Sequence, residues 1–380
     1  MRRKGKLLMH FLLSMFTVIL LVVVIVIAYL LFIGKGQVEQ FTDESGNIIP
    51  GSVAEKIMVD INGIDQGMFI RGIDSNNPVL LFVHGGPGVP EFFLNETWQT
   101  DLEKYFTVCW WEARGSGLSY DKNHDISSIT TQQLVEDAIH VTEYLSNRFG
   151  KDKIYLMGHS FGTLIGIQAA AHRPDLYQAY IGMSQAVGND LSGAISNTLT
   201  YNYMVDIFTA WNDKTSLNKL DMWSVKHDDG TVTFNQNALS QLDDLKHKAG
   251  CGTMHSMDSV ITGIFLPQMN SRCYTLPEKI DYWCGKALMQ STVLYEEMLT
   301  INLFEQVLSL EIPVYFFSGI YDYTCPYPLS LEYFEALTTP LKGFYTFDNS
   351  AHSPLWEEPD KTVEVLVEDV LKETIKLSDQ

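Results

Sequence analysis

Basic residues are scarce in this 380-residue chain, and they are concentrated at its beginning. The sequence has 26 lysines and arginines against 46 aspartates and glutamates. Five of the basic residues lie within residues 1–36, which contain no acidic residue, so the rest of the chain carries 21 basic against 46 acidic groups, a net charge of −25. A surface this acidic repels phosphate backbones, which excludes nucleic acid as an expected partner.

Cysteine is also scarce, and its spacing excludes the common metal and redox motifs. None of the five cysteines forms a Cys-X-X-Cys pair, so we expect neither a metal nor another cofactor. Cys109 lies inside the apolar run 106–111 and is expected to be buried. Cys251, Cys273 and Cys284 share one region, where an outward-facing domain can form one disulfide, although the sequence does not select the pair.

One long apolar run is present near the N-terminus. Residues 11–33 are long enough to cross a bilayer as a helix. Four basic residues precede the run and acidic residues follow Lys35, so the positive-inside rule predicts a cytoplasmic N-terminus and an extracytoplasmic remainder. A cleaved signal peptide is the alternative, but its apolar core is usually shorter and ends at small residues. Because residues 29–33 remain bulky, the sequence favours a retained single-pass anchor.

The rest of the chain alternates strand-length apolar runs with helical patterns. A helix is expected over Thr131–Phe149, which has apolar residues on one face and Gly150 as a C-terminal stop. Continuous apolar runs suit strands that are buried on both faces of a parallel sheet. The fold class is therefore α/β, with a mostly parallel sheet flanked by helices. Strands are expected at Val79–Val83, Thr107–Trp111, Ile154–Met157, Ala179–Met183, Val314–Phe317 and Gly343–Phe347.

Other segments complete the predicted organisation. Asn62-Gly63 predicts a tight hairpin turn between Lys56–Ile61 and Ile64–Ile70. The strand–helix rhythm stops near residue 188 and resumes near residue 312, which indicates an insertion. Helices are expected at 240–248, 286–299 and 360–377. We divide the chain into a cytoplasmic tip and transmembrane anchor (1–36), a juxtamembrane stalk (37–54), a first core part (55–187), a mainly helical cap insertion (188–307) and a second core part (308–380).

Gly158-His159-Ser160-Phe161-Gly162 lies between a predicted strand and a predicted helix. This pattern is typical of a nucleophile elbow, in which a serine occupies a strained turn and the flanking glycines allow close packing. Ser160 is therefore the candidate nucleophile.

A serine hydroxyl needs a base, and the base needs an orienting acid. In elbow proteins the acid and then the histidine follow the serine along the chain. Asp322 and His352 each follow a predicted strand, in loops where such side chains are needed. Taken singly, Asp322 is equally well a turn residue and His352 a structural one, but together they match the required order. Asp348 is the rival acid.

Acyl transfer also requires donors that stabilise an oxyanion. The glycine-rich stretch 84–88 directly follows a predicted strand. We expect the N–H groups of Gly86 and Phe161 to form the oxyanion hole, with Gly85 as the substitute for Gly86. A merely structural glycine turn is the alternative.

With these motifs the chain resembles the α/β-hydrolase fold, and within it the proline iminopeptidase-like family of serine peptidases. The resemblance covers the chain from about Lys56 onward, with residues 188–307 in the position of the cap. It rests on the elbow, on residues 84–88, on Arg114 to Ser119, and on the segments that contain Asp322 and His352. It implies that Ser160, Asp322 and His352 are nucleophile, acid and base.

Two departures bear on the substrate. The elbow has His159 and Phe161, as in esterases, where proline iminopeptidases typically have Gly and Trp. The glutamates with which those peptidases hold the substrate amine have no recognisable match, so Glu91, Glu296 and Glu297 are the candidates for that role. We expect an aminopeptidase acting on short peptides. A carboxylesterase or amidase on small acyl substrates is the alternative, and a non-catalytic binding module is the alternative from another class.

Overall fold

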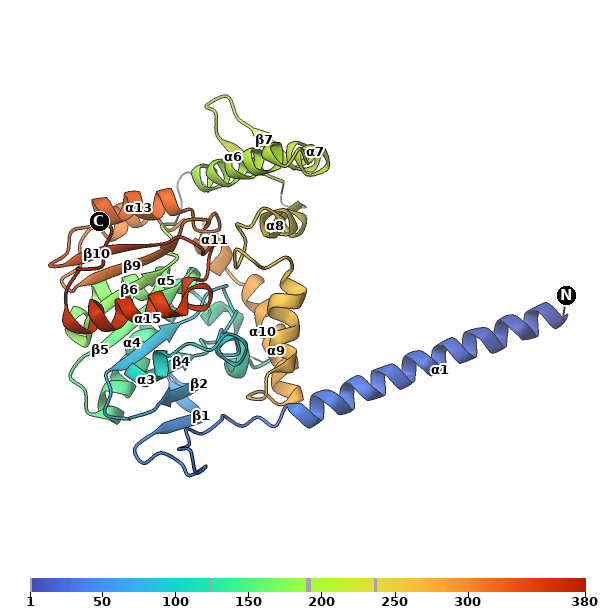
Figure 1. The fold of residues 1–380 in the computed structure, drawn as a ribbon, viewed down its shortest axis with the longest axis horizontal. Helices are drawn as coiled ribbons and strands as arrows, with labels where there is room; N and C mark the ends of the chain where they lie inside the picture. The colour runs from blue at the N-terminus through green and yellow to red at the C-terminus, as the bar shows by residue number, and fades with distance from the viewer. Residues whose placement is uncertain (1, 124, 189–192, 236–237, 299) are drawn as a thin grey trace.

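The computed structural model describes residues 2–123, 125–188, 193–235, 238–298 and 300–380. Within these ranges the chain forms an eight-stranded sheet with the order β1-β2-β4-β3-β5-β6-β9-β10 (Figure 1). The pairs β1–β2 and β2–β4 are antiparallel, and the other neighbours are parallel. The predicted α/β class with a mostly parallel sheet is thus confirmed. The strands are β1 (Val53–Ile61), β2 (Ile64–Gly72), β3 (Val79–Val83), β4 (Thr107–Trp111), β5 (Ile154–His159), β6 (Tyr177–Met183), β9 (Val314–Gly319) and β10 (Lys342–Phe347).

Helices cover both faces of the sheet. Side chains alternate along each strand, so Leu81 and Val83 of β3 join one core cluster while Leu80 and Phe82 join the other. The first cluster contains buried residues of α4, α5 and α13, and the second contains those of α2, α3, α14 and α15. These helices are α2 (Leu94–Thr97), α3 (Leu102–Tyr105), α4 (Thr131–Phe149), α5 (Phe161–His172), α13 (Tyr327–Ala336), α14 (Pro354–Glu357) and α15 (Pro359–Glu368), with short 3₁₀ turns η1 (Gly117–Ser119), η2 (Ile126–Ser128), η3 (Pro174–Leu176) and η6 (Val370–Lys372).

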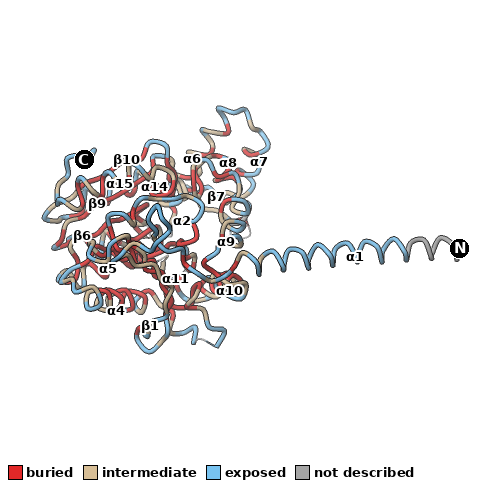
Figure 2. The backbone as a smooth tube through the Cα atoms, turned by 60° about the horizontal axis from the view of Figure 1, so that its bottom comes forward, coloured by how far each residue is buried: buried red, intermediate tan, exposed pale blue. Residues whose placement is uncertain are grey.

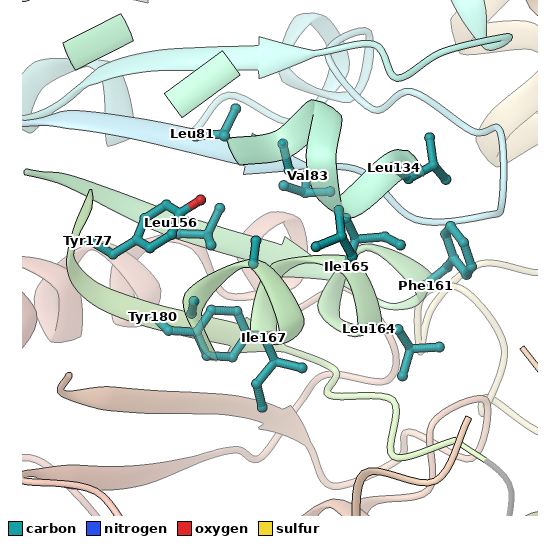
Figure 3. Packing of buried hydrophobic residues seen from close by; sticks show 14 of the residues in the cluster. Leu81, Val83, Leu134, Leu156, Phe161, Leu164, Ile165, Ile167, Tyr177 and Tyr180 are labelled. Carbon is teal, nitrogen blue, oxygen red and sulfur yellow. The ribbon is translucent and has the colours of Figure 1, made fainter. Parts of the chain in front are cut away.

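Helix α5 follows the elbow and is buried against the sheet. Figure 3 shows Leu164, Ile165 and Ile167 of α5 among Leu81 and Leu156 of the strands beneath it. Few polar side chains are present on α5, so its position is fixed by apolar burial on both sides. The elbow at its start is therefore held by a rigid helix.

The cap lies between β6 and β9 and is mainly helical. Its Tyr274 hydroxyl donates to the Glu112 carboxylate of the core, and burial raises the pKa of Glu112 to about 7. The cap contains α6 (Ala194–Ala210), α7 (Lys214–Trp223), the hairpin β7 (Ser224–Lys226) and β8 (Val232–Phe234), α8 (Leu239–Lys248), the π-helical η5 (Ile261–Phe265), α9 (Leu266–Asn270), α10 (Leu276–Gln290), α11 (Leu294–Met298) and α12 (Leu303–Gln306).

Two expected helices differ from the structure. The helix expected over 286–299 is interrupted, because α10 ends at Gln290 and α11 begins at Leu294; Leu299 lies outside the described residues. The helix expected over 360–377 ends at Glu368. There the Asp369 carboxylate accepts the N–H groups of Lys376 and Leu377 at 2.8 Å, which turns the chain back on itself.

The N-terminal helix α1 (Arg2–Ile33) projects from the globular part (Figure 1). Its segment Met9–Ile33 is mainly apolar and long enough to cross a membrane, and most of its residues are exposed (Figure 2). Residues 37–54 were expected to form a stalk, but they contact the domain. Arg71 donates to the Glu39 carbonyl and stacks over Phe41 at 4.5 Å. Part of the predicted stalk therefore packs against the domain.

All five cysteines are free thiols in the described structure. Cys251 and Cys273 are buried and Cys284 is exposed on α10. The disulfide considered for this region is therefore not formed. Burial raises the pKa of Cys251 to about 12, so this thiol stays protonated and unreactive and serves only in packing.

Candidate active site

The turn between β5 and α5 places Ser160 at the edge of the sheet. Ser160 has φ +53° and ψ −123°, a strained conformation for a residue with a side chain. A Cβ on Gly158 would lie 2.6 Å from the Gly162 carbonyl, and a Cβ on Gly162 would lie 2.1 Å from the Val83 carbonyl. Only glycine fits at both positions, which explains the spacing of the motif physically. The Ser160 N–H donates to the Met183 carbonyl at 3.1 Å and fixes the turn.

The structure brings Asp322 and His352 together from two loops at the carboxyl ends of β9 and β10. His352 Nδ1 donates to Asp322 Oδ2 at 2.9 Å, and both residues are buried. Asp322 Oδ1 accepts the N–H groups of Thr324 and Cys325, each at 2.9 Å. Burial alone would raise the pKa of Asp322, but the adjacent His352 and these donors outweigh burial and lower it. An ionised Asp322 keeps the proton on Nδ1 and leaves Nε2 free to act as a base.

The His352 loop is tied to the elbow through its backbone. His159 Nε2 donates to the His352 carbonyl at 2.7 Å, and the Ser184 hydroxyl donates to the same oxygen at 2.9 Å. Glu357 Oε1 accepts the N–H groups of Ala351 and Ser353 at 2.9 and 3.0 Å. Both sides of His352 are thereby held in place.

Both ring nitrogens of His159 face acceptor oxygens. Its Nε2 lies 2.7 Å from the His352 carbonyl and its Nδ1 lies 2.6 Å from Glu91 Oε1, an arrangement that suits a protonated ring. Burial would lower the pKa of His159, but the Glu91 carboxylate and these hydrogen bonds raise it above its ordinary value. Glu91 therefore forms a buried ion pair directly beside the elbow.

Replacing Glu91 by glutamine should destabilise the protein by about 3 kcal/mol, because it leaves the buried His159 without its counter-charge. The pKa of His159 is raised in the folded protein. The ion pair therefore contributes fully to the free energy of unfolding below pH 6.5, the ordinary histidine value, and this contribution is lost as pH rises through the raised pKa. Melting curves of the wild type and Glu91→Gln should therefore differ most at low pH and converge at high pH. Glu296→Gln, at an exposed position, is the matched control. An equal loss at every pH would contradict the ion pair.

The predicted oxyanion donors lie beside Ser160. Gly86, Ser160 and Phe161 line one cavity, and the N–H groups of Gly86 and Phe161 have no hydrogen-bond partner among the described residues. Gly86 has φ +121°, a conformation that favours glycine. Gly85 was the predicted substitute, but its N–H donates to Glu91 Oε2 at 3.3 Å. The structure therefore favours Gly86 over Gly85 as the donor.

The cavity above Ser160 has a volume of about 230 Å³. Its wall is built from α5, the loop after β6, the start of α6, Met298 of α11 and the loop that contains Cys325. None of the described residues that line it is charged. The cavity therefore suits an uncharged, largely apolar group.

The three candidate carboxylates for substrate binding lie outside the lining of this cavity. Glu91 is paired with His159 behind the loop of residues 84–88. Glu296 is exposed on α11. Glu297 Oε2 accepts the Thr131 N–H at 2.6 Å, at the start of α4. Glu91 and Glu297 are thus engaged in other contacts, and Glu296 is exposed.

Sequence reasoning missed two positioning residues, His159 and Glu357. His159 stands inside the elbow motif, but its partners Glu91 and the His352 carbonyl are distant in the chain, and no local pattern reveals them. Glu357 is five residues after His352, a separation that does permit a loop-stabilising contact to be predicted.

Known proteins match this chain over most of its length. The family model described as the alpha/beta hydrolase fold matches residues 78–359. The probable aminopeptidase YbaC of Bacillus subtilis (strain 168) is 30% identical over 308 residues, which cover 81% of this chain and 93% of that protein. A proline iminopeptidase of Saccharolobus solfataricus is 24% identical over 81% of this chain and 89% of its own length. A crystal structure of the Mycobacterium smegmatis proline iminopeptidase shares the fold, with a TM-score of 0.56 and 13% identity over 84% of this chain and 98% of that one.

Proposed function

The chain belongs to the α/β-hydrolase fold family, as a proline iminopeptidase-like hydrolase, and from this premise we propose that it is a membrane-anchored serine aminopeptidase acting on short peptides. The observation that carries the proposal is the Asp322–His352 pair at 2.9 Å, tied through His159 to the strained Ser160 turn. The relatives from Bacillus subtilis and Saccharolobus solfataricus are both named as peptidases, which favours a peptide substrate.

In the proposed reaction, Ser160 Oγ attacks the carbonyl carbon of the substrate while His352 Nε2 takes the hydroxyl proton. Asp322 stabilises the resulting imidazolium, and the N–H groups of Gly86 and Phe161 donate to the oxyanion. The C–N bond breaks as His352 gives its proton to the leaving amine. Water then attacks the acyl-enzyme with His352 as base, and Ser160 is released.

A carboxylesterase or amidase is the second candidate, and the uncharged cavity lining favours it. An aminopeptidase that recognises a free ammonium group usually places a carboxylate near the scissile bond, because a buried charge needs a partner. Glu91, Glu296 and Glu297 lie outside the lining, so they support that role only if they move. A non-catalytic binding module is disfavoured, because the chain keeps the Asp322–His352 pair and a serine in the strained turn.

A panel of substrates separates these candidates. We expect aminoacyl amides of proline and alanine to be hydrolysed, and we expect N-blocking to reduce kcat/KM strongly. Turnover of p-nitrophenyl esters alone, with no effect of N-blocking on the amides, would reject the aminopeptidase and support the esterase.

We also propose that α1 is retained as a single-pass anchor, with its N-terminus cytoplasmic and the catalytic domain outside. The proposal is supported by the 25-residue, mainly apolar span Met9–Ile33 and by the four basic residues before it. The substrate would then be met outside the cytoplasm.

A further inference from the structure

Two neighbouring segments of the cap expose large apolar side chains. On η5 and α9, Ile261 is 60% exposed, Phe265 40% and Leu266 44%. On α10, Ile280 is 54% exposed. Scattered single apolar residues are normal on protein surfaces, but a contiguous group usually marks an interaction site.

These side chains form one surface. The ring centroids of Phe265 and Trp283 lie 5.2 Å apart, a contact that joins η5 to α10. The exposed residues of α10 recur at spacings of three and four, so they lie on one side of the helix. We name as the cap patch the exposed side chains of Ile261, Phe265, Leu266, Ile280, Cys284 and Ala287.

Helix α1 leaves the domain at the same place. The Tyr29 hydroxyl donates to Asn270 Oδ1 at 3.3 Å, at the end of α9. The Gly36 N–H donates to the Arg272 carbonyl at 3.1 Å, between α9 and α10. Figures 1 and 2 show α1 projecting from the side of the domain that α9 and α10 form.

The junction between α1 and the cap is short and closely packed. A Cβ on Gly34 would lie 2.8 Å from the Tyr274 carbonyl and 2.9 Å from Lys279 Nζ, so the chain passes directly over α10. Only two residues separate Ile33 from Gly36, and three residue steps reach about 10 Å at most. If α1 spans a bilayer, the turn that contains Arg272, between α9 and α10, lies about that distance from the end of the span.

The composition around the junction is typical of a membrane interface. Lys286 lies over the ring of Trp283 at 5.3 Å, and Lys35 lies over Phe32 at 6.0 Å. Aromatic rings and lysines are both enriched where hydrocarbon meets headgroups. These cations stand out on a domain whose net charge is strongly negative.

We propose that the cap patch lies in the headgroup region of the bilayer that α1 crosses. The bilayer is favoured over a second copy of the chain because α1 itself leads from this face. The contact restrains α10, whose Met289 packs against Gly88 at the end of the glycine-rich stretch 84–88, so the membrane fixes the cap relative to the active site. This inference rests on the proposed anchoring by α1.

The test uses the full chain in lipid vesicles, with an environment-sensitive fluorophore on one cysteine and lipids that carry a quencher. Cys284 is exposed within the patch, whereas Cys109, Cys251 and Cys273 are buried. Two further chains carry Cys284→Ser and a new cysteine for the label. Leu20→Cys places the label inside α1, and Gln380→Cys places it at the C-terminus, which lies on the side of the domain away from α10 (Figure 1). Subtracting the signal of Cys284→Ser alone removes any labelling of Cys325.

We expect the lipid quenchers to remove most of the fluorescence at Cys284 and Leu20→Cys and little at Gln380→Cys. Adding Ile280→Glu to the Cys284 chain should restore its fluorescence. Quenching at Leu20→Cys without quenching at Cys284 would overturn the cap-patch proposal and leave the anchor intact. No quenching at Leu20→Cys would overturn the anchor and the cap-patch proposal together. A shielded but unquenched Cys284 probe would indicate a second copy of the chain and also overturn the proposal.

Discussion

Replacing Ser160 by alanine should reduce turnover by about 10⁴- to 10⁶-fold and leave the fold intact. The loss follows because no other hydroxyl occupies the strained turn between β5 and α5. The fold should persist because alanine keeps the Cβ that this turn already accommodates, and Gly158 and Gly162 remain to allow the close packing.

The measurement is kcat/KM on the best substrate of the panel, with melting curves recorded in parallel. Ser45→Ala is the matched control, because Ser45 is exposed in the segment before β1. We expect its turnover and melting temperature to equal those of the wild type. If Ser160→Ala retains most of the wild-type turnover, the nucleophile lies elsewhere.

Replacing Asp322 by asparagine should reduce turnover by about 10⁴-fold. Asp322 Oδ1 accepts two backbone N–H groups, so the oxygen of the asparagine must stay in that position. Its NH₂ group then faces His352 Nδ1, which can only accept from it. The histidine proton moves to Nε2, and the base that should activate Ser160 is lost.

Asp348→Asn is the control for this change, since Asp348 is the rival acid near His352. Its side chain is 72% exposed and lies 3.9 Å from Lys361. We expect kcat/KM of Asp348→Asn to match the wild type. The assignment of the acid would be wrong if Asp348→Asn lost activity while Asp322→Asn kept it.

Local patterns predicted the elements that position this site. The bounds predicted for β3 and β4 match the structure at both ends. Both strands are buried on both faces, so each is a continuous apolar run that is easy to delimit in the sequence. Helix α4 was predicted with the same precision. Thr130 caps its first turn through Gln133 N, and Gly150 ends it at φ +61°.

Features that depend on distant contacts were not predictable in this way. The final helix ends at Glu368 because Asp369 accepts N–H groups from residues that follow it in the chain. The segment 37–54 reads as a polar stalk, yet Phe41 lies under Arg71 of β2. A glutamate is usually solvated, and only the fold brings Glu91 to its partner His159.

The same distinction between local patterns and distant contacts applies to the residues of the candidate site. Ser160, Asp322 and His352 were predicted because each follows a strand, and the carboxyl ends of parallel strands meet at one edge of the sheet. The structure brings His352 Nδ1 to 2.9 Å from Asp322 Oδ2. The choice between Gly85 and Gly86 required the Glu91 contact, which sequence spacing does not encode. Substrate recognition remained open because it depends on how the cap packs over the core.

Reaction with a fluorophosphonate tests the proposed nucleophile most directly. Mass spectrometry of the labelled full-length chain should show a single adduct, and peptide mapping should place it on Ser160. The adduct should be absent from Ser160→Ala and should form far more slowly in Asp322→Asn. An adduct on another residue, or equal labelling of Ser160→Ala, would contradict the mechanism proposed for this hydrolase.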